Sequence, residues 1–110
     1  MSEQRPERIA RVWPEPGAVA PPLSHVGAAL MVDPSWLRGA DVDASALRLV
    51  VDGVDRTAEC VVRTTMSMPP NRVDLVYRPV VPMDAGPHGA TISWSSPEGG
   101  GSYEWSFEVA

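Results

Sequence analysis

The segment Tyr103-Glu-Trp-Ser-Phe-Glu-Val109 alternates apolar and polar side chains without interruption. Side chains of a β-strand point to opposite faces in turn, so this period of two predicts a strand with one buried and one exposed face. The preceding segment Ala90–Ser95 alternates in the same way, with Ile92 and Trp94 on its apolar face. The glycine-rich stretch 96–101 separates the two segments, which predicts a β-hairpin.

Five further segments are predicted strands in a chain of 110 residues that contains 12 prolines and 9 glycines. They are Ile9–Trp13, Val26–Val32, Leu47–Val51, about Glu59–Thr65, and Val73–Tyr77. Four alternate in the same way, and the one near 59–65 is less regular because Cys60, Val61 and Val62 are consecutive apolar residues. Proline and glycine at such short intervals leave no room for a long helix. Seven short strands with turns between them predict an all-β fold, an antiparallel β-sandwich of two sheets.

The middle of the chain contains one predicted turn and one open alternative. The Asp52-Gly53 pair follows a predicted strand and favours a tight reversal. A short helix between Asp43 and Leu49, with an aspartate as its N-cap, competes with the start of that strand. Because Leu47, Leu49 and Val51 keep a period of two, we expect no more than a single helical turn there.

The composition is that of one globular domain, which we expect to span residues 1–110 with a flexible tail at 1–8. Hydrophobic residues make up 44% of the chain, and no apolar run approaches the roughly 18 residues that span a membrane. Nine basic residues, all arginine, stand against 14 acidic residues, a net charge of 9 − 14 = −5. The arginines are scattered among carboxylates, so we expect neither a nucleic-acid nor a membrane partner.

The single cysteine, Cys60, excludes an internal disulfide and fits a reducing compartment. The first residues, through Arg8, are charged and lack the apolar segment of a secretory signal. As written, the chain is therefore expected to be cytoplasmic. A domain taken from a longer exported protein would be extracellular.

Three stretches resemble the bacterial immunoglobulin-like domains found as modules in multidomain proteins. Ala46–Thr57 is similar to that family's strand, Asp-Gly turn and Asp-x-Thr exit. Tyr77–His88 resembles the segment that crosses between the sheets, and Trp105–Val109 resembles the closing strand. The resemblance implies an immunoglobulin-like sandwich of about seven strands and implies no activity.

The nucleophiles and bases of the chain form no recognisable catalytic pattern. Cys60 would need a neighbouring base, and His25 and His88 are both distant in sequence. Two histidines without a partner two or four residues away also make a poor zinc site, so we expect no metal and no cofactor. His88 follows Gly86-Pro87, where we expect its ring to hydrogen-bond the main chain and hold the crossing, as tyrosine does in related sandwiches.

Trp36 is the most informative single residue, because it lies in a polar connection and not in an alternating segment. It is either a plug over the open end of the core or an exposed anchor for a partner. Trp13, Trp94 and Trp105, in contrast, are interpreted as core residues. The aspartates near the middle strand either bond the local backbone or bind calcium, with Asp41 and Asp43 as the candidate ligands: Asp33, Asp41, Asp43, Asp52 and Asp55.

These observations favour a non-enzymatic immunoglobulin-like module for protein interaction or spacing. Its partner would be another protein or a neighbouring domain. The alternative is a module that binds carbohydrate or calcium through Trp36, Asp41 and Asp43. A third hypothesis makes the chain the accessory domain of a larger enzyme.

Overall fold

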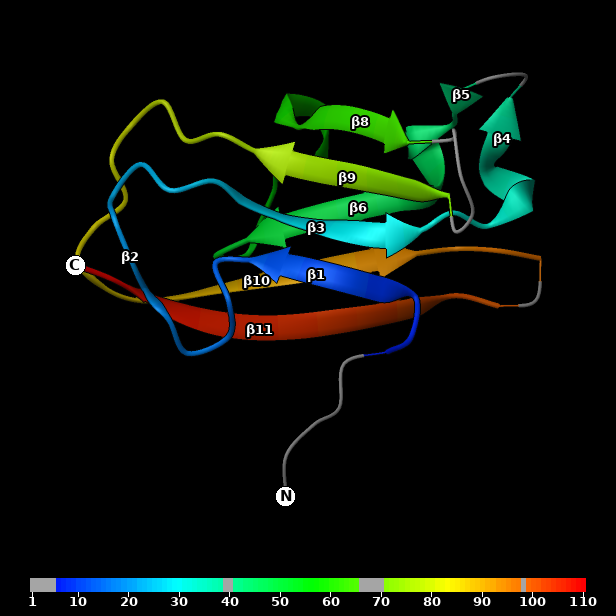
Figure 1. Cartoon of the computed structure of the whole chain (residues 1–110). Coiled ribbons are helices and arrows are strands. Elements are labelled where there is room, and N and C mark those ends of the chain that lie inside the picture. The colour runs from blue at the N-terminus through cyan, green and yellow to red at the C-terminus, as the bar shows by residue number, and fades with distance from the viewer. Residues whose placement is uncertain (1–5, 39–40, 66–70, 98) are drawn as a thin grey trace.

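A computed structural model describes residues 6–38, 41–65, 71–97 and 99–110. Two β-sheets lie face to face (Figure 1). The four-stranded sheet has the order β1 (Ile9–Trp13), β3 (Val26–Met31), β9 (Arg72–Tyr77), β8 (Val61–Thr65). The five-stranded sheet has the order β2 (Val19–Ala20), β11 (Gly101–Val109), β10 (Gly86–Trp94), β6 (Leu47–Val51), β7 (Val54–Asp55).

The remaining elements are short. β4 (Leu37–Arg38) and β5 (Asp41–Val42) pair with each other, and three 3₁₀ turns, η1 (Pro34–Trp36), η2 (Ala44–Ala46) and η3 (Thr57–Glu59), lie between strands. Within the described ranges, no helix has the length and apolar character needed to cross a membrane.

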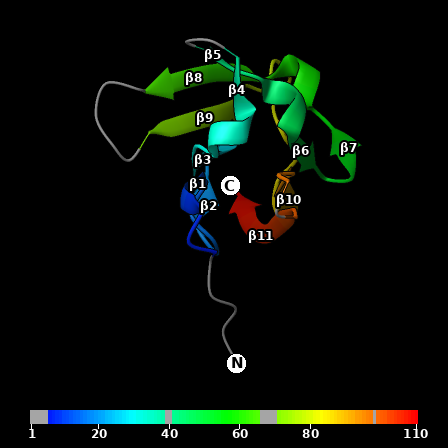
Figure 2. The ribbon, with the colours of Figure 1, turned by 90° about the vertical axis from the view of Figure 1, so that its right-hand side faces the viewer.

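The strand order confirms the predicted immunoglobulin-like sandwich. The seven predicted strands are β1, β3, β6, β8, β9, β10 and β11. Of these seven, β1, β3, β9 and β8 form one sheet, and β6, β10 and β11 form the other. In chain order these are strands 1, 2, 5 and 4 against strands 3, 6 and 7, which is the immunoglobulin arrangement. Figure 2 shows the two sheets as separate layers. All pairings are antiparallel except that of β2 with β11.

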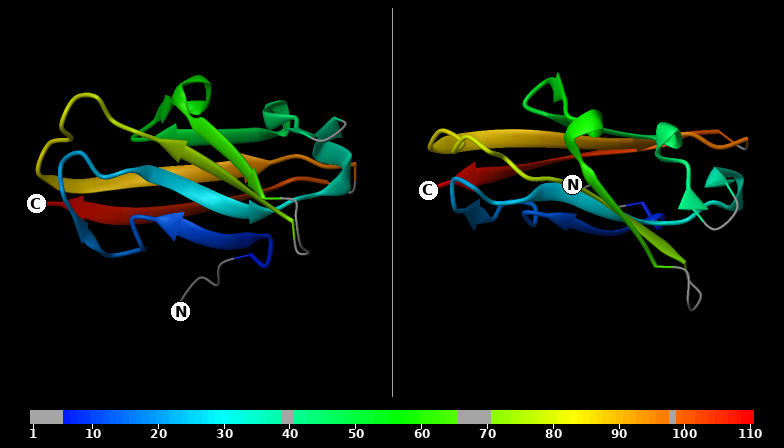
Figure 3. Two further views of the ribbon diagram at one scale, coloured as in Figure 1. Left: turned by 45° about the horizontal axis from the view of Figure 1, so that its top comes forward. Right: turned by 90° about the horizontal axis from the view of Figure 1, so that it is seen from above.

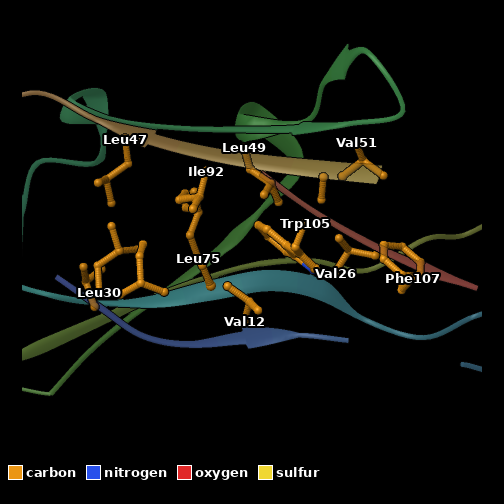
Figure 4. Close-up of a cluster of buried hydrophobic side chains, with 14 of the residues drawn as sticks. Val12, Val26, Leu30, Leu47, Leu49, Val51, Leu75, Ile92, Trp105 and Phe107 are labelled. Atoms are coloured by element: carbon orange, nitrogen blue, oxygen red, sulfur yellow. The ribbon is translucent and has the colours of Figure 1, made fainter. Parts of the chain in front are cut away.

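The core lies between the sheets and follows the predicted alternation. On β11, Trp105, Phe107 and Val109 are buried, whereas the glutamates and serine between them are exposed. Across the gap, Val26 and Leu75 of the other sheet belong to the same cluster of buried side chains (Figure 4). The indole Nε1 of Trp105 has no hydrogen-bond partner among the described residues, so apolar packing holds this ring.

The interpretation of Trp13 as a core residue is wrong. The register of β1 with β3 shifts between Ile9 and Arg11, so the strand contains an irregularity of the β-bulge type. Ile9 and Val12 are both buried as a result, and Trp13 is only half-buried, outside the core cluster. Its ring lies against the Arg11 guanidinium, 5.6 Å from the ring centroid. One extra residue thus moves the tryptophan out of the buried phase.

Both predicted reversals are present. β10 and β11 pair as a hairpin from Gly86↔Val109 to Trp94↔Gly101. Asp52 and Gly53 join β6 to β7 with positive φ angles of 51° and 80°. Two consecutive left-handed residues match the twist of flanking strands, which explains the Asp-Gly pair.

The competing helix is a single turn, η2, which ends at Ala46 before β6 begins. Residues 6–8 are the described part of the segment that we expected to be a flexible tail. Arg8 donates to the carbonyl of Met31 at 3.0 Å and pairs with Asp33, so this residue is held against the sandwich. Residues 1–5 lie outside the described part of the chain.

Trp105→Ala is expected to lower the free energy of unfolding by about 3–5 kcal/mol, because it leaves a cavity where a large buried ring was packed. Ser106→Ala, one residue away on the exposed face, should change it little. Urea unfolding followed by circular dichroism compares the two variants. Equally small decreases in the free energy of unfolding of both variants would contradict the assignment of Trp105 to the buried face and Ser106 to the exposed face of β11.

Candidate functional site

The Trp36 side chain closes one end of the core. Only 2% of the residue is exposed, and it belongs to the buried cluster. Its Nε1 donates to the carbonyl of Ser95 at 2.6 Å, and the Arg8 guanidinium lies 5.3 Å from its ring centroid. Trp36 is thus buried at the end of the core, as the plug interpretation predicts, and it is not an exposed anchor.

Asp41 and Asp43, the two candidate calcium ligands, lie in the connection that follows Trp36, and the structure describes the side chain of Asp43 only. Asp43 is half-buried, and its Oδ1 accepts from the backbone nitrogen of Ser45 at 2.9 Å, which starts the single turn η2. Asp41 lies on β5, paired with Arg38, and the placement of its side chain lies outside the description. Asp43 therefore performs the local backbone bonding that was the alternative to calcium binding.

The other aspartates of this group also bond nearby N–H groups. Asp33 accepts from the backbone nitrogen of Ser35, and this bond is the largest cause of a lowered Asp33 pKa. Asp55 accepts from Thr57, whose hydrogen bonds likewise lower the pKa of that carboxyl. Over the described ranges, no group of three or more His, Cys, Asp or Glu side chains could hold a metal ion.

His88 holds the opposite end of the sandwich. Its Nδ1 lies 2.6 Å from Oδ2 of Asp52, in the β6–β7 turn, and its Nε2 lies 2.6 Å from the carbonyl oxygen of Asp84, in the β9–β10 connection. The ring stacks on Phe107, with centroids 5.7 Å apart. The expected main-chain bond is confirmed. The carboxylate partner, Asp52, was not anticipated, because residues 36 apart carry no sequence signal of contact.

Both ring nitrogens of His88 face acceptors, and only an imidazolium has an N–H on each nitrogen. The hydrogen bond with Asp52, followed by that with Asp84, raises the pKa of His88 above its ordinary value. Asp52 Oδ1 also accepts from the backbone nitrogen of Gly89 at 2.9 Å, so the carboxylate is fixed in place. One side chain thus joins a turn, a connection and a strand.

Cys60 lies between η3 and β8, not within a strand as predicted. The residue is half-buried, and its thiol donates to the carbonyl of Arg56, with Sγ and O 3.3 Å apart. Burial, with Glu59 and Asp55 nearby, raises the pKa of the thiol to about 11. A thiol of this kind is protonated and a poor nucleophile near neutral pH.

The β8 strand is an open sheet edge. It ends the four-stranded sheet and pairs with β9 alone. None of its five residues is buried, and Val61 and Val62 are each 39% exposed. Figure 3 shows β8 beside β9, whose other side pairs with β3. The edge and both faces of β8 are therefore accessible.

The register gives each face of β8 a different character. Val62 pairs with Leu75 and thus faces the same side as the core. Arg63 pairs with Asp74 on the outer side, but Oδ1 of Asp74 already accepts from Nε of Arg72 at 2.9 Å. Within the described part of the chain, the side chain of Arg63 has no ion pair or hydrogen bond.

The other edges of the two sheets are less suited to pairing. β1 has five residues but contains the irregularity that displaces Trp13. β2 and β7 have two residues each. Bulges and short strands are common protections against unwanted pairing. β8 is thus a regular edge of five residues, and the N-terminal part of β11, which pairs with β2 only at Glu108 and Val109, is a second stretch of open edge.

The raised pKa of His88 predicts that stability falls with rising pH. The contribution of its contacts is complete below the unfolded-state pKa of about 6.5 and is lost as pH rises through the higher folded-state pKa. His88→Gln should remove this part of the pH dependence, measured by urea unfolding between pH 6 and 9. The control His25→Gln, at an exposed histidine, should keep it. If the pH dependence of the unfolding free energy were lost in His25→Gln and kept in His88→Gln, the role assigned to His88 would be contradicted.

The raised pKa of Cys60 predicts slow alkylation. At pH 8 a thiol with a pKa of about 11 is ionised to about one part in a thousand, against roughly a quarter for a free cysteine. Iodoacetamide, followed by mass spectrometry, should therefore modify the native protein roughly 100-fold more slowly than the urea-unfolded protein. Equal rates would show that the native fold does not shield the thiol.

The immunoglobulin-like strand order specifies a fold and, by itself, no activity. No protein-family model matches the chain, and no curated protein matches it either. Because no relative assigns a site, the candidate site is defined from the structure alone, as the residues of β8 and their register with β9.

Proposed function

We propose that this chain is a non-catalytic immunoglobulin-like module that binds an extended segment of another protein along β8. The open edge of β8 is the observation that carries the proposal, because it is regular, five residues long and exposed on both faces. Its strand order and the three stretches that resemble bacterial immunoglobulin-like modules support assignment to that class.

Strand addition uses what such an edge offers. A free edge presents backbone N–H and C=O groups that an incoming segment can pair, and this main-chain pairing supplies the affinity. Side chains that alternate between the two faces supply the specificity. Val62 would be covered on the core side, and Arg63 would be contacted on the outer side.

The chemistry of the described nucleophile and bases supports binding over catalysis. The Cys60 thiol is held protonated, and both nitrogens of His88 are engaged with Asp52 and Asp84. The alternative of a carbohydrate module acting through Trp36 has no support from that residue, because its ring is buried.

Val62→Lys is expected to weaken binding at the edge, since a charged side chain directed toward the core side opposes strand pairing. Val62 is 39% exposed, so the lysine amine can reach water and the fold is retained. The matched control is Val81→Lys in the β9–β10 connection, where 71% of the valine is exposed. Peptides selected from a phage-displayed random library on the unmodified protein are then titrated by fluorescence polarisation.

Selected peptides should bind Val62→Lys at least about tenfold more weakly and bind Val81→Lys as they bind the unmodified protein. Circular dichroism and thermal unfolding verify that both variants are folded. If only Val81→Lys lost binding, the binding site would lie at the exposed valines of the β9–β10 connection, which would contradict the proposal. A library that yields no specific peptide would contradict it as well.

A further inference from the structure

We infer that the segment received by β8 carries an acidic residue opposite Arg63 and an apolar residue opposite Val62. This inference rests on the proposed function and names the chemistry of the partner. It follows from the register of β8 with β9, which assigns Val62 and Arg63 to opposite faces of the sheet.

The outer face of the edge has an unused positive charge. β8 contains Arg63 and no carboxylate. On β9, Arg72 and Asp74 satisfy each other at 2.9 Å, so the neighbouring carboxylate is already engaged. The described β8–β9 ladder thus has a local charge of +1, from two arginines and one aspartate, in a protein of net charge −5.

A carboxylate on the incoming strand is the natural partner of this guanidinium. Residues directly opposite each other on one face of a sheet lie close enough to interact, and opposite charges there strengthen pairing whereas like charges weaken it. The fork of donors on arginine also matches the two oxygens of a carboxylate. We expect a gain of about two- to fivefold in affinity from a carboxylate at this position.

The inner face of the edge requires a different residue. Val62 lies beside the buried Leu75 and is 39% exposed, so the apolar surface between the sheets continues to the edge. Thr64, next on that face, is half-buried and pairs with the buried Val73. An apolar residue opposite Val62 would extend the core by one strand and remove this surface from water.

A second copy of this chain fits the edge less well. Two β8 strands paired antiparallel about Arg63 would bring two guanidinium groups opposite each other, which weakens pairing. Each copy also has a net charge of −5, so the two proteins repel each other at long range.

The test uses three synthetic peptides that alternate threonine and valine and differ only at the centre, where they carry glutamate, glutamine or lysine. Each is titrated into the isotope-labelled full chain, and amide shifts are followed by NMR. The glutamate peptide should shift the amides of β8 and bind best, and the lysine peptide should bind worst. Arg63→Glu should reverse this order. Arg78→Glu, an exposed arginine outside the ladder that changes the net charge equally, should not.

The outcomes separate this inference from the proposed function. Equal affinities for the three peptides, with shifts along β8, would overturn the acidic preference and leave strand addition in place. Shifts elsewhere, or none with any peptide, would overturn both. Concentration-dependent β8 shifts in the protein alone, with a dimer in sedimentation velocity, would assign the edge to a second copy and overturn the inference.

Discussion

Burial of the apolar side chains between the two sheets is the constraint on which the rest of this structure depends. The single cysteine cannot form an internal disulfide, so packing between the sheets is what holds them together. Trp105 and Phe107 fill the space in front of strands from the opposite sheet, and neither exposes more than 3% of its surface. A change of strand register by one residue would exchange this row for the glutamates beside it.

A two-sheet core is open at both ends, and each end of this one is closed by a ring with a polar atom. Trp36 joins the β3–β6 connection to the end of β10 through its bond to Ser95. His88 joins the β6–β7 turn and the β9–β10 connection to β10. A ring of this kind covers apolar surface and also satisfies loop backbone or side-chain groups, which a purely apolar side chain cannot do. Residues that resemble binding or catalytic groups in sequence are thus part of the framework.

With its ends closed in this way, the molecule keeps β8 as a regular edge available for pairing. β1 is interrupted by its irregularity, and β2 and β7 are too short to form a ladder of useful length. β8 keeps its regular register with β9, and Arg63 is the charge that protects it against self-pairing. In the strand addition that we propose, the same arginine would make the edge selective, because a strand that carries a carboxylate would convert a repulsive group into an attractive one.

The sequence by itself determined the strands and the fold class. Alternation predicted the seven main strands, and the Asp52-Gly53 pair predicted its turn, because the period of two and left-handed backbone conformations are local properties of the chain. The main-chain bond of His88 was also predicted. The exposure of Trp13 was not, because a single extra residue in β1 reverses the phase and leaves no mark in composition. The choice between plug and anchor for Trp36 required knowing that Ser95, 59 residues away, lies beside it. Likewise, only the tertiary structure decided that β8 is an edge, since the order of strands in a sheet depends on contacts between distant segments and not on the pattern within any one of them.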